Sequence, residues 1–119
     1  MQVSEQEKQG ILRAIDLYGE GGRKASGKIT AEAFSPTATM SWTEDGKIKS
    51  VPIQVLIDGF ENGEPMEASY ELTTLDVAED VAIVRIESQF GPSKYADMFT
   101  LVKDGDLWKI VSKIYHVKN

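Results

Sequence analysis

The first part of the chain carries apolar residues at helical spacing. Ser4 is followed three residues later by Glu7, a capping-box signature that predicts the start of a helix. Charged and amide side chains occupy the positions between the apolar ones, so one face of this helix is expected to pack inward. The apolar positions that recur every three or four residues are Ile11, Leu12, Ile15 and Tyr18.

Glycines follow this apolar stripe at positions 19, 21 and 22. They are interpreted as the end of the first helix or a hinge in it. A phosphate-binding loop is disfavoured because the stretch lacks the glycine-lysine-serine/threonine ending and no apolar strand precedes it.

The middle of the chain mixes short helices with a strand. A proline disfavours the helical region for the residue before it, so a helix is expected to stop at Ser35-Pro36. Alternating residues that follow are typical of a strand, and Gly59 is a helix terminator. The predicted elements are a helix over 29–34, a strand over 38–43, a tight turn at Asp45-Gly46, a helix over 52–58 and a loop over 61–65.

From residue 66 onward the hydrophobic period changes to two, which predicts strands over 66–78, 81–90 and 95–117. Asp104-Gly105 divides the last stretch into a hairpin, and these two residues favour a type I′ turn that also determines the register. Helices followed by long strands predict an α+β domain over residues 1–119. About three helices are expected on one face of a curved antiparallel sheet, enclosing a pocket.

The expected register places Asp97 beside Ser112, with Ser88 next to it on the neighbouring strand. A carboxylate among aromatic residues is costly to bury unless it is hydrogen-bonded or used in function. Asp97 is therefore a candidate acid, base or ligand anchor, against the alternative of a solvated or hydroxyl-satisfied aspartate at the rim. His116, the single histidine, is a second candidate catalytic residue, expected on the same face about two residue pairs away, against the alternative of a surface histidine.

Aromatic residues are candidates for the lining of the pocket. They are suited to a flat apolar or heteroaromatic ligand, although the same spacing is typical of an ordinary core. The candidate ligand-binding residues are Tyr18, Trp42, Tyr95, Phe99, Ser88 and Ser112.

Composition excludes several kinds of chemistry. The chain has 119 residues, no cysteine and one histidine, so thiolate chemistry is excluded and neither a metal cluster nor a cofactor is expected. A net charge of -6 with scattered lysines argues against nucleic acid and acidic membranes as partners. The N-terminal stretch is polar and acidic, unlike a secretory signal, and no apolar run approaches the roughly 20 residues of a membrane helix, so a cytoplasmic location is expected.

Four segments match a known pattern in order and spacing: the helix end at 18–21, the step at 34–38, and the strands at 95–102 and 107–113. Together they resemble the nuclear transport factor 2-like superfamily, and within it the SnoaL-like, putative lumazine-binding branch. The resemblance implies a cone-shaped fold around a pocket, usually in a homodimer. It implies no single reaction, because relatives include isomerases, dehydratases and cyclases.

Three functions are compatible with these observations. The favoured one is a small-molecule binding protein in which Asp97 orients an apolar or heteroaromatic ligand. It is favoured because only one polar pocket residue can be placed securely, whereas an enzyme of this group usually has two or more facing one another. The alternatives are a cofactor-free lyase or isomerase with Asp97 as general acid or base, and a non-catalytic dimerisation module.

Overall fold

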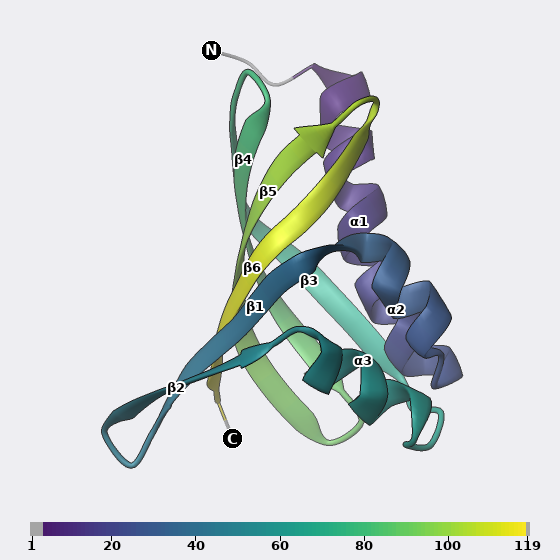
Figure 1. Ribbon diagram of the computed structural model, residues 1–119, viewed down its shortest axis with the longest axis vertical. Helices are drawn as coiled ribbons and strands as arrows, with labels where there is room; N and C mark the ends of the chain where they lie inside the picture. Colours follow the sequence, from purple (N-terminus) through teal and green to yellow (C-terminus); the bar gives the residue numbers. More distant parts are fainter. Residues whose placement is uncertain (1–3, 119) are drawn as a thin grey trace.

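The computed structural model describes residues 4–118, so the first three residues of the polar N-terminal stretch and Asn119 lie outside it. The described residues form three helices and six strands, with the helices gathered beside one face of a strongly twisted sheet (Figure 1). In chain order the elements are α1 (Glu5–Lys24), α2 (Gly27–Ala33), β1 (Phe34–Glu44), β2 (Lys47–Pro52), α3 (Gln54–Glu61), β3 (Ala68–Ala78), β4 (Val81–Phe90), β5 (Ser93–Asp104) and β6 (Leu107–Val117).

Helix α1 begins at the predicted cap, where Ser4 Oγ accepts a hydrogen bond from the Glu7 amide at 3.1 Å. The prediction that the glycines end the helix is wrong, since α1 continues to Lys24. A Cβ at Gly21 would overlap Thr30 of α2, and one at Gly22 would lie 2.6 Å from the Phe90 ring of β4. The glycines therefore allow α1 to approach its neighbours closely.

The second helix is shorter than predicted, because Phe34 already belongs to β1 and the strand runs through Ser35-Pro36. Asp45 and Gly46 have positive φ angles of 53° and 76°, which agrees with the predicted tight turn. Strand β2 after this turn was not predicted, because most of its residues are exposed and it lacks an alternating buried face. It is an edge strand that pairs only with β1 among the described residues.

The sheet has the strand order β2-β1-β6-β5-β4-β3. The expectation of a purely antiparallel sheet needs correction, because β1 pairs with β6 in parallel while the other neighbours are antiparallel. The parallel pair is possible because β2, α3 and the whole of β3–β5 separate β1 from β6 along the chain.

The β5–β6 hairpin turns at Gly105-Asp106, one residue later than predicted, so that Asp104 pairs with Leu107. Gly105 has a positive φ of 62°. Farther along, Leu101 pairs with Ile110 but Thr100 pairs with Ser112, which leaves Val111 as an extra residue in a β-bulge. The bulge reverses the facing of β6 from this point to its end.

The β4–β5 register also differs from the prediction, with Ile86 rather than Ser88 opposite Asp97. This shift is two residues, so the predicted inward face of β4 is retained. The core lies between this face and the helices, and its largest fully buried side chains include Trp108 and Phe99. None of the helices in residues 4–118 is long and apolar enough to span a membrane.

Candidate functional site

A buried ion pair lies between the sheet and the helices. Asp97 of β5 and Lys113 of β6 both point inward, with relative exposures of 0% and 3%. The Lys113 Nζ atom is 3.6 Å from Asp97 Oδ1. Side chains of these types are seldom fully buried unless they are paired, so the arrangement is the main chemical feature of the inner face.

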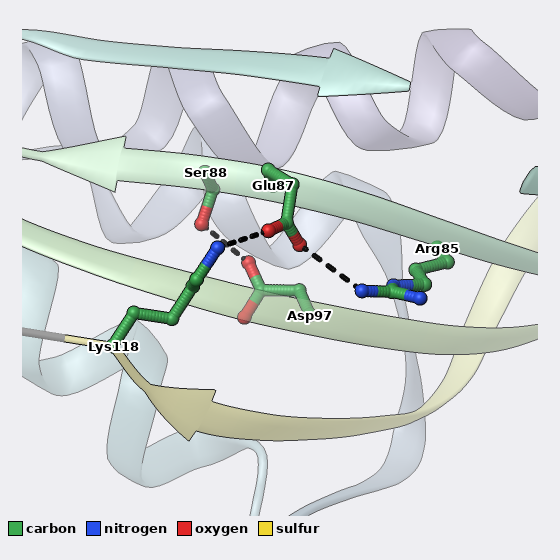
Figure 2. A network of polar contacts seen from close by, with 5 residues as sticks. All are labelled: Arg85, Glu87, Ser88, Asp97 and Lys118. Carbon is green, nitrogen blue, oxygen red and sulfur yellow. Dashed lines mark hydrogen bonds and ion pairs between the residues drawn. The ribbon is translucent and has the colours of Figure 1, made fainter. Parts of the chain in front are cut away.

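Two hydroxyl groups hold one oxygen of the Asp97 carboxylate. Ser88 Oγ donates to Oδ2 at 2.6 Å, and Tyr18 Oη donates to the same oxygen at 3.4 Å. Figure 2 shows the Ser88 and Asp97 side chains pointing toward each other from neighbouring strands. Oδ1 is buried and has no hydrogen-bond partner among the described residues, so its principal electrostatic neighbour is Lys113.

Figure 2 also shows a second network near Ser88 and Asp97, in which Glu87 contacts Lys118 and Arg85. Glu87 is adjacent to Ser88 in the strand, so their side chains point to opposite faces of the sheet. This network therefore belongs to the outer face and is separate from the buried pair.

The neighbours of the Lys113 ammonium group, apart from Asp97, are a thioether and two aromatic rings. Nζ lies 4.0 Å from Met40 Sδ, 4.0 Å from the Tyr115 ring centroid and 5.5 Å from the Tyr18 ring centroid. Burial lowers the pKa of Lys113 from its usual value of 10.5, and the nearby Asp97 carboxylate partly opposes this effect. The site therefore favours an amine that exchanges its proton more readily than an exposed lysine.

The pKa of Tyr18 shifts in the opposite direction to that of Lys113. Its burial, together with the charge of Asp97, raises the pKa of the phenol well above 10.0. The hydroxyl group therefore keeps its proton and serves as a fixed donor to the carboxylate.

A cavity of about 360 Å³ lies against Lys113. Its wall combines one ammonium group with aromatic and aliphatic side chains, whereas Asp97 and Ser88 are not among the lining residues. Lys113 thus contacts both the cavity and the carboxylate behind it. The lining residues are Tyr18, Met40, Leu56, Phe60, Met66, Phe90, Pro92, Ser93, Tyr95, Lys113 and Tyr115.

The structure brings several of the sequence-predicted residues to this region. Tyr18 and Tyr95 line the cavity, and Ser88 binds Asp97. Phe99 is buried in the core, with its ring centroid 5.5 Å from that of Tyr18. Trp42 lines a second hollow of about 370 Å³ on β1, β2, β5 and β6, where its ring stacks on Tyr115.

Two of the predicted residues are displaced from Asp97. Ser112 does not lie beside it but shares a 2.6 Å hydroxyl contact with Thr100. His116 pairs with Ala96 and lines the second hollow, so it is not on the face of Asp97 as expected. The bulge at Val111 explains both errors, because it turns the residues after it to the face opposite the predicted one.

Sequence reasoning missed Lys113 for the same reason. With regular alternation from Trp108 and Ile110, residue 113 would point outward, whereas the bulge turns it inward. The sequence signal of the irregularity is weak, because Ile110-Val111 breaks the alternation but so do Leu107-Trp108 and Ile114-Tyr115. Among residues 4–118 no group of three or more histidine, cysteine, aspartate or glutamate side chains could hold a metal ion.

Comparisons with known proteins agree with this architecture. A family model described as "Putative lumazine-binding" matches residues 6–116. Aldolase FrzH of Cladobotryum sp is 28% identical over 117 residues, which cover 96% of this chain and 94% of the relative.

Two solved structures extend the comparison to the fold. An NTF2-like protein of Shewanella baltica OS155 has a TM-score of 0.87 and 32% identity, covering 100% of this chain and 99% of its own. An NTF2-like protein of Methylobacillus flagellatus KT has a TM-score of 0.86 and 28% identity, covering 99% and 97%. The chain belongs to the putative lumazine-binding family and has the NTF2-like fold.

Proposed function

We propose that this protein is a cofactor-free lyase or isomerase that acts on a carbonyl compound bound in the inner cavity. The observation that carries the proposal is the buried Lys113–Asp97 pair, with Lys113 in the lining of an aromatic cavity. Four polar side chains now face one another where the sequence placed only one securely, and this favours an enzyme over a binding protein.

The cavity suits a small, flat organic molecule. About 360 Å³ lies within the usual range of small-molecule pockets, roughly 300–1,000 Å³. Aromatic side chains such as Phe60, Phe90 and Tyr95 offer surfaces for a planar ring, and Lys113 offers one positive charge to an oxygen atom. The name of the matched family, lumazine-binding, is consistent with a heteroaromatic ligand.

The charge of Lys113 supports chemistry next to a carbonyl group. When a carbon beside a carbonyl loses a proton, or a carbon–carbon bond there breaks, negative charge develops on the carbonyl oxygen. A cation fixed in an apolar cavity stabilises that charge more strongly than water does. FrzH is named an aldolase, and aldol chemistry has the same requirement.

In this proposal Lys113 gives and takes the proton, and Asp97 acts as its fixed counter-ion. A general acid or base works best when its pKa lies near the working pH, and burial moves Lys113 in that direction. Asp97 does not line the cavity, so in this proposal Lys113 rather than Asp97 meets the substrate.

A binding protein without catalysis is the second candidate. It is favoured by the complete burial of Asp97, which leaves Lys113 as the one charged side chain among the lining residues of the cavity. Lys113 would then orient a ligand oxygen and catalyse no reaction.

Deuterium exchange separates the two candidates. A panel of aromatic aldehydes and ketones with α-hydrogens is incubated with the protein in D2O, and NMR follows the loss of the α-proton signal. We expect exchange with the wild type and none above buffer with Lys113→Met. Lys47→Met, on exposed strand β2, is the matched control and is expected to retain the wild-type rate.

The same panel is screened for thermal stabilisation. Stabilisation without deuterium exchange would support the binding protein and contradict the enzyme. Absence of both effects across the panel would contradict a carbonyl compound as the ligand.

A further inference from the structure

We infer that Lys113 is a covalent nucleophile, whose amine forms an iminium with an aldehyde or ketone in the inner cavity. The inference rests on the proposed function and narrows it to substrates whose carbonyl carbon is open to attack by an amine.

The surroundings of Nζ leave the amine available. Among the described residues its closest partners are a carboxylate oxygen at 3.6 Å, a thioether sulfur at 4.0 Å and the Tyr115 ring. None of these is a short hydrogen bond that would hold the nitrogen in one orientation. Lys113 therefore differs from Lys103, whose Nζ donates to Glu7 Oε1 at 2.9 Å.

Burial adds to this availability. An amine attacks a carbonyl group only in its neutral form, and lysines that react in this way are activated by desolvation in apolar pockets. Lowering the pKa gives roughly ten times more neutral amine at neutral pH for each unit of the shift. The pKa of Lys113 is lowered by burial, and its side chain lines the cavity in which a substrate would lie.

The reaction balances without another reactant. The ammonium group releases a proton, and the nitrogen lone pair forms a carbon–nitrogen bond while the carbonyl π electrons move to oxygen. The nitrogen then loses a second proton and the oxygen takes up two, so that the nitrogen lone pair forms the C=N double bond while the carbon–oxygen bond breaks with its electron pair and water leaves. The sum is an ammonium and a carbonyl compound giving an iminium and water.

The buried Asp97 carboxylate can pair with the cation that is present before the reaction and with the one that is present after it. The iminium carries the same single positive charge as the ammonium, so Asp97 is paired with a cation before and after the covalent step. Ser88 and Tyr18 hold Oδ2 in place, and Oδ1 is left facing the nitrogen. Asp97 lacks a cationic partner only while the amine is neutral, and Ser88 and Tyr18 still donate to its carboxylate at that stage.

Reductive trapping tests the inference. Wild-type protein is incubated separately with benzaldehyde and acetaldehyde, then treated with sodium borohydride, and peptide mass spectrometry locates the alkylated lysines. We expect the benzyl or ethyl group mainly on Lys113, well above its level on the exposed Lys47 and Lys49. Adducts confined to exposed lysines with both aldehydes would overturn the inference.

Variants provide the controls. Lys113→Arg keeps a cation beside Asp97 but cannot form an iminium, so the dominant adduct should disappear while Lys47→Arg retains it. Circular dichroism checks that each variant is folded, and Asp97→Asn/Lys113→Met, which removes both charges, replaces Lys113→Arg if that variant unfolds. A labelling pattern unchanged in these variants would also overturn the inference.

The outcomes distinguish this inference from the proposed function. Deuterium exchange that depends on Lys113 without a trapped adduct would leave acid–base catalysis standing and remove the covalent step. A trapped adduct without exchange would establish the nucleophile and contradict the lyase or isomerase.

Discussion

Removing the charge of Lys113 is expected to destabilise the fold because it leaves a buried carboxylate without its counter-ion. Lys113→Met keeps a long apolar side chain in the same space, so the change isolates the ammonium group. Removing one partner of a buried ion pair costs about 3–5 kcal/mol. We expect a loss near the lower limit, about 3 kcal/mol, because two hydroxyl groups still hold Asp97 Oδ2.

The partner substitution, Asp97→Asn, leaves Lys113 among a thioether and two aromatic rings. Its cost is expected to be similar, about 3 kcal/mol, because the buried ammonium then lacks a negative neighbour. The double variant buries no net charge. We expect it to lose only about 2 kcal/mol, well below the sum of the single losses, because neutral replacements of a buried pair are often tolerated.

Urea unfolding at neutral pH measures these differences, with the fluorescence of the buried Trp108 as the reporter. Lys103→Met is the matched control, because its ion pair with Glu7 is partly exposed and should contribute less than about 1 kcal/mol. If Lys113→Met costs no more than this control, or if the two single losses simply add, the reasoning about the buried pair is refuted.

Three further predictions follow from the same structure. Burial lowers the pKa of Lys113 below 10.5 in the folded protein, so between the lowered value and 10.5 the unfolded chain binds more protons than the folded one. In this pH range the free energy of unfolding of the wild type should therefore rise with pH relative to that of Lys113→Met. Parallel pH profiles of the two proteins would contradict this. Gly21→Ala should lower the melting temperature, because the overlap of the new Cβ with Thr30 costs about 1–3 kcal/mol, whereas the better helix propensity of alanine contributes about 1 kcal/mol. Adding Thr30→Ala should recover part of the loss. A Gly21→Ala variant more stable than the wild type would refute the close packing. We also propose that a homodimer forms through the outer sheet face, where Met98 and Ile114 are 45% and 48% exposed; Met98→Arg should then give a monomer in light scattering, and an unchanged mass would place any dimer contact elsewhere.

Much of the fold was predictable from local patterns. The capping box at Ser4 marks the start of α1, and the change of period at residue 66 separates helices from the long strands. Asp97 was correctly expected on the inner face near Ser88, because a two-residue register error preserves the side to which each residue points.

The rest of the site depends on effects that a pattern does not contain. The stretch Lys103-Asp104-Gly105-Asp106 permits a turn at either of two adjacent pairs, and both choices leave Trp108 and Ile110 facing inward, so the alternation along the strand does not select the observed turn at Gly105-Asp106. The parallel pairing of β1 with β6 joins segments about 70 residues apart, which brings Met40 beside Lys113. No local signal encodes such a contact.

The bulge at Val111 has a consequence for comparing relatives. Consider a homologue that lacks this extra residue but is otherwise alike. In a sequence alignment, the residue that fills the space of Lys113 would then stand beside a neighbour of Lys113 and not beside Lys113 itself. A single insertion or deletion in β6 could therefore exchange the buried lysine for a hydroxyl or an aliphatic side chain without any substitution. The residues that fill this space in such proteins are better compared by superposed strands than by aligned letters.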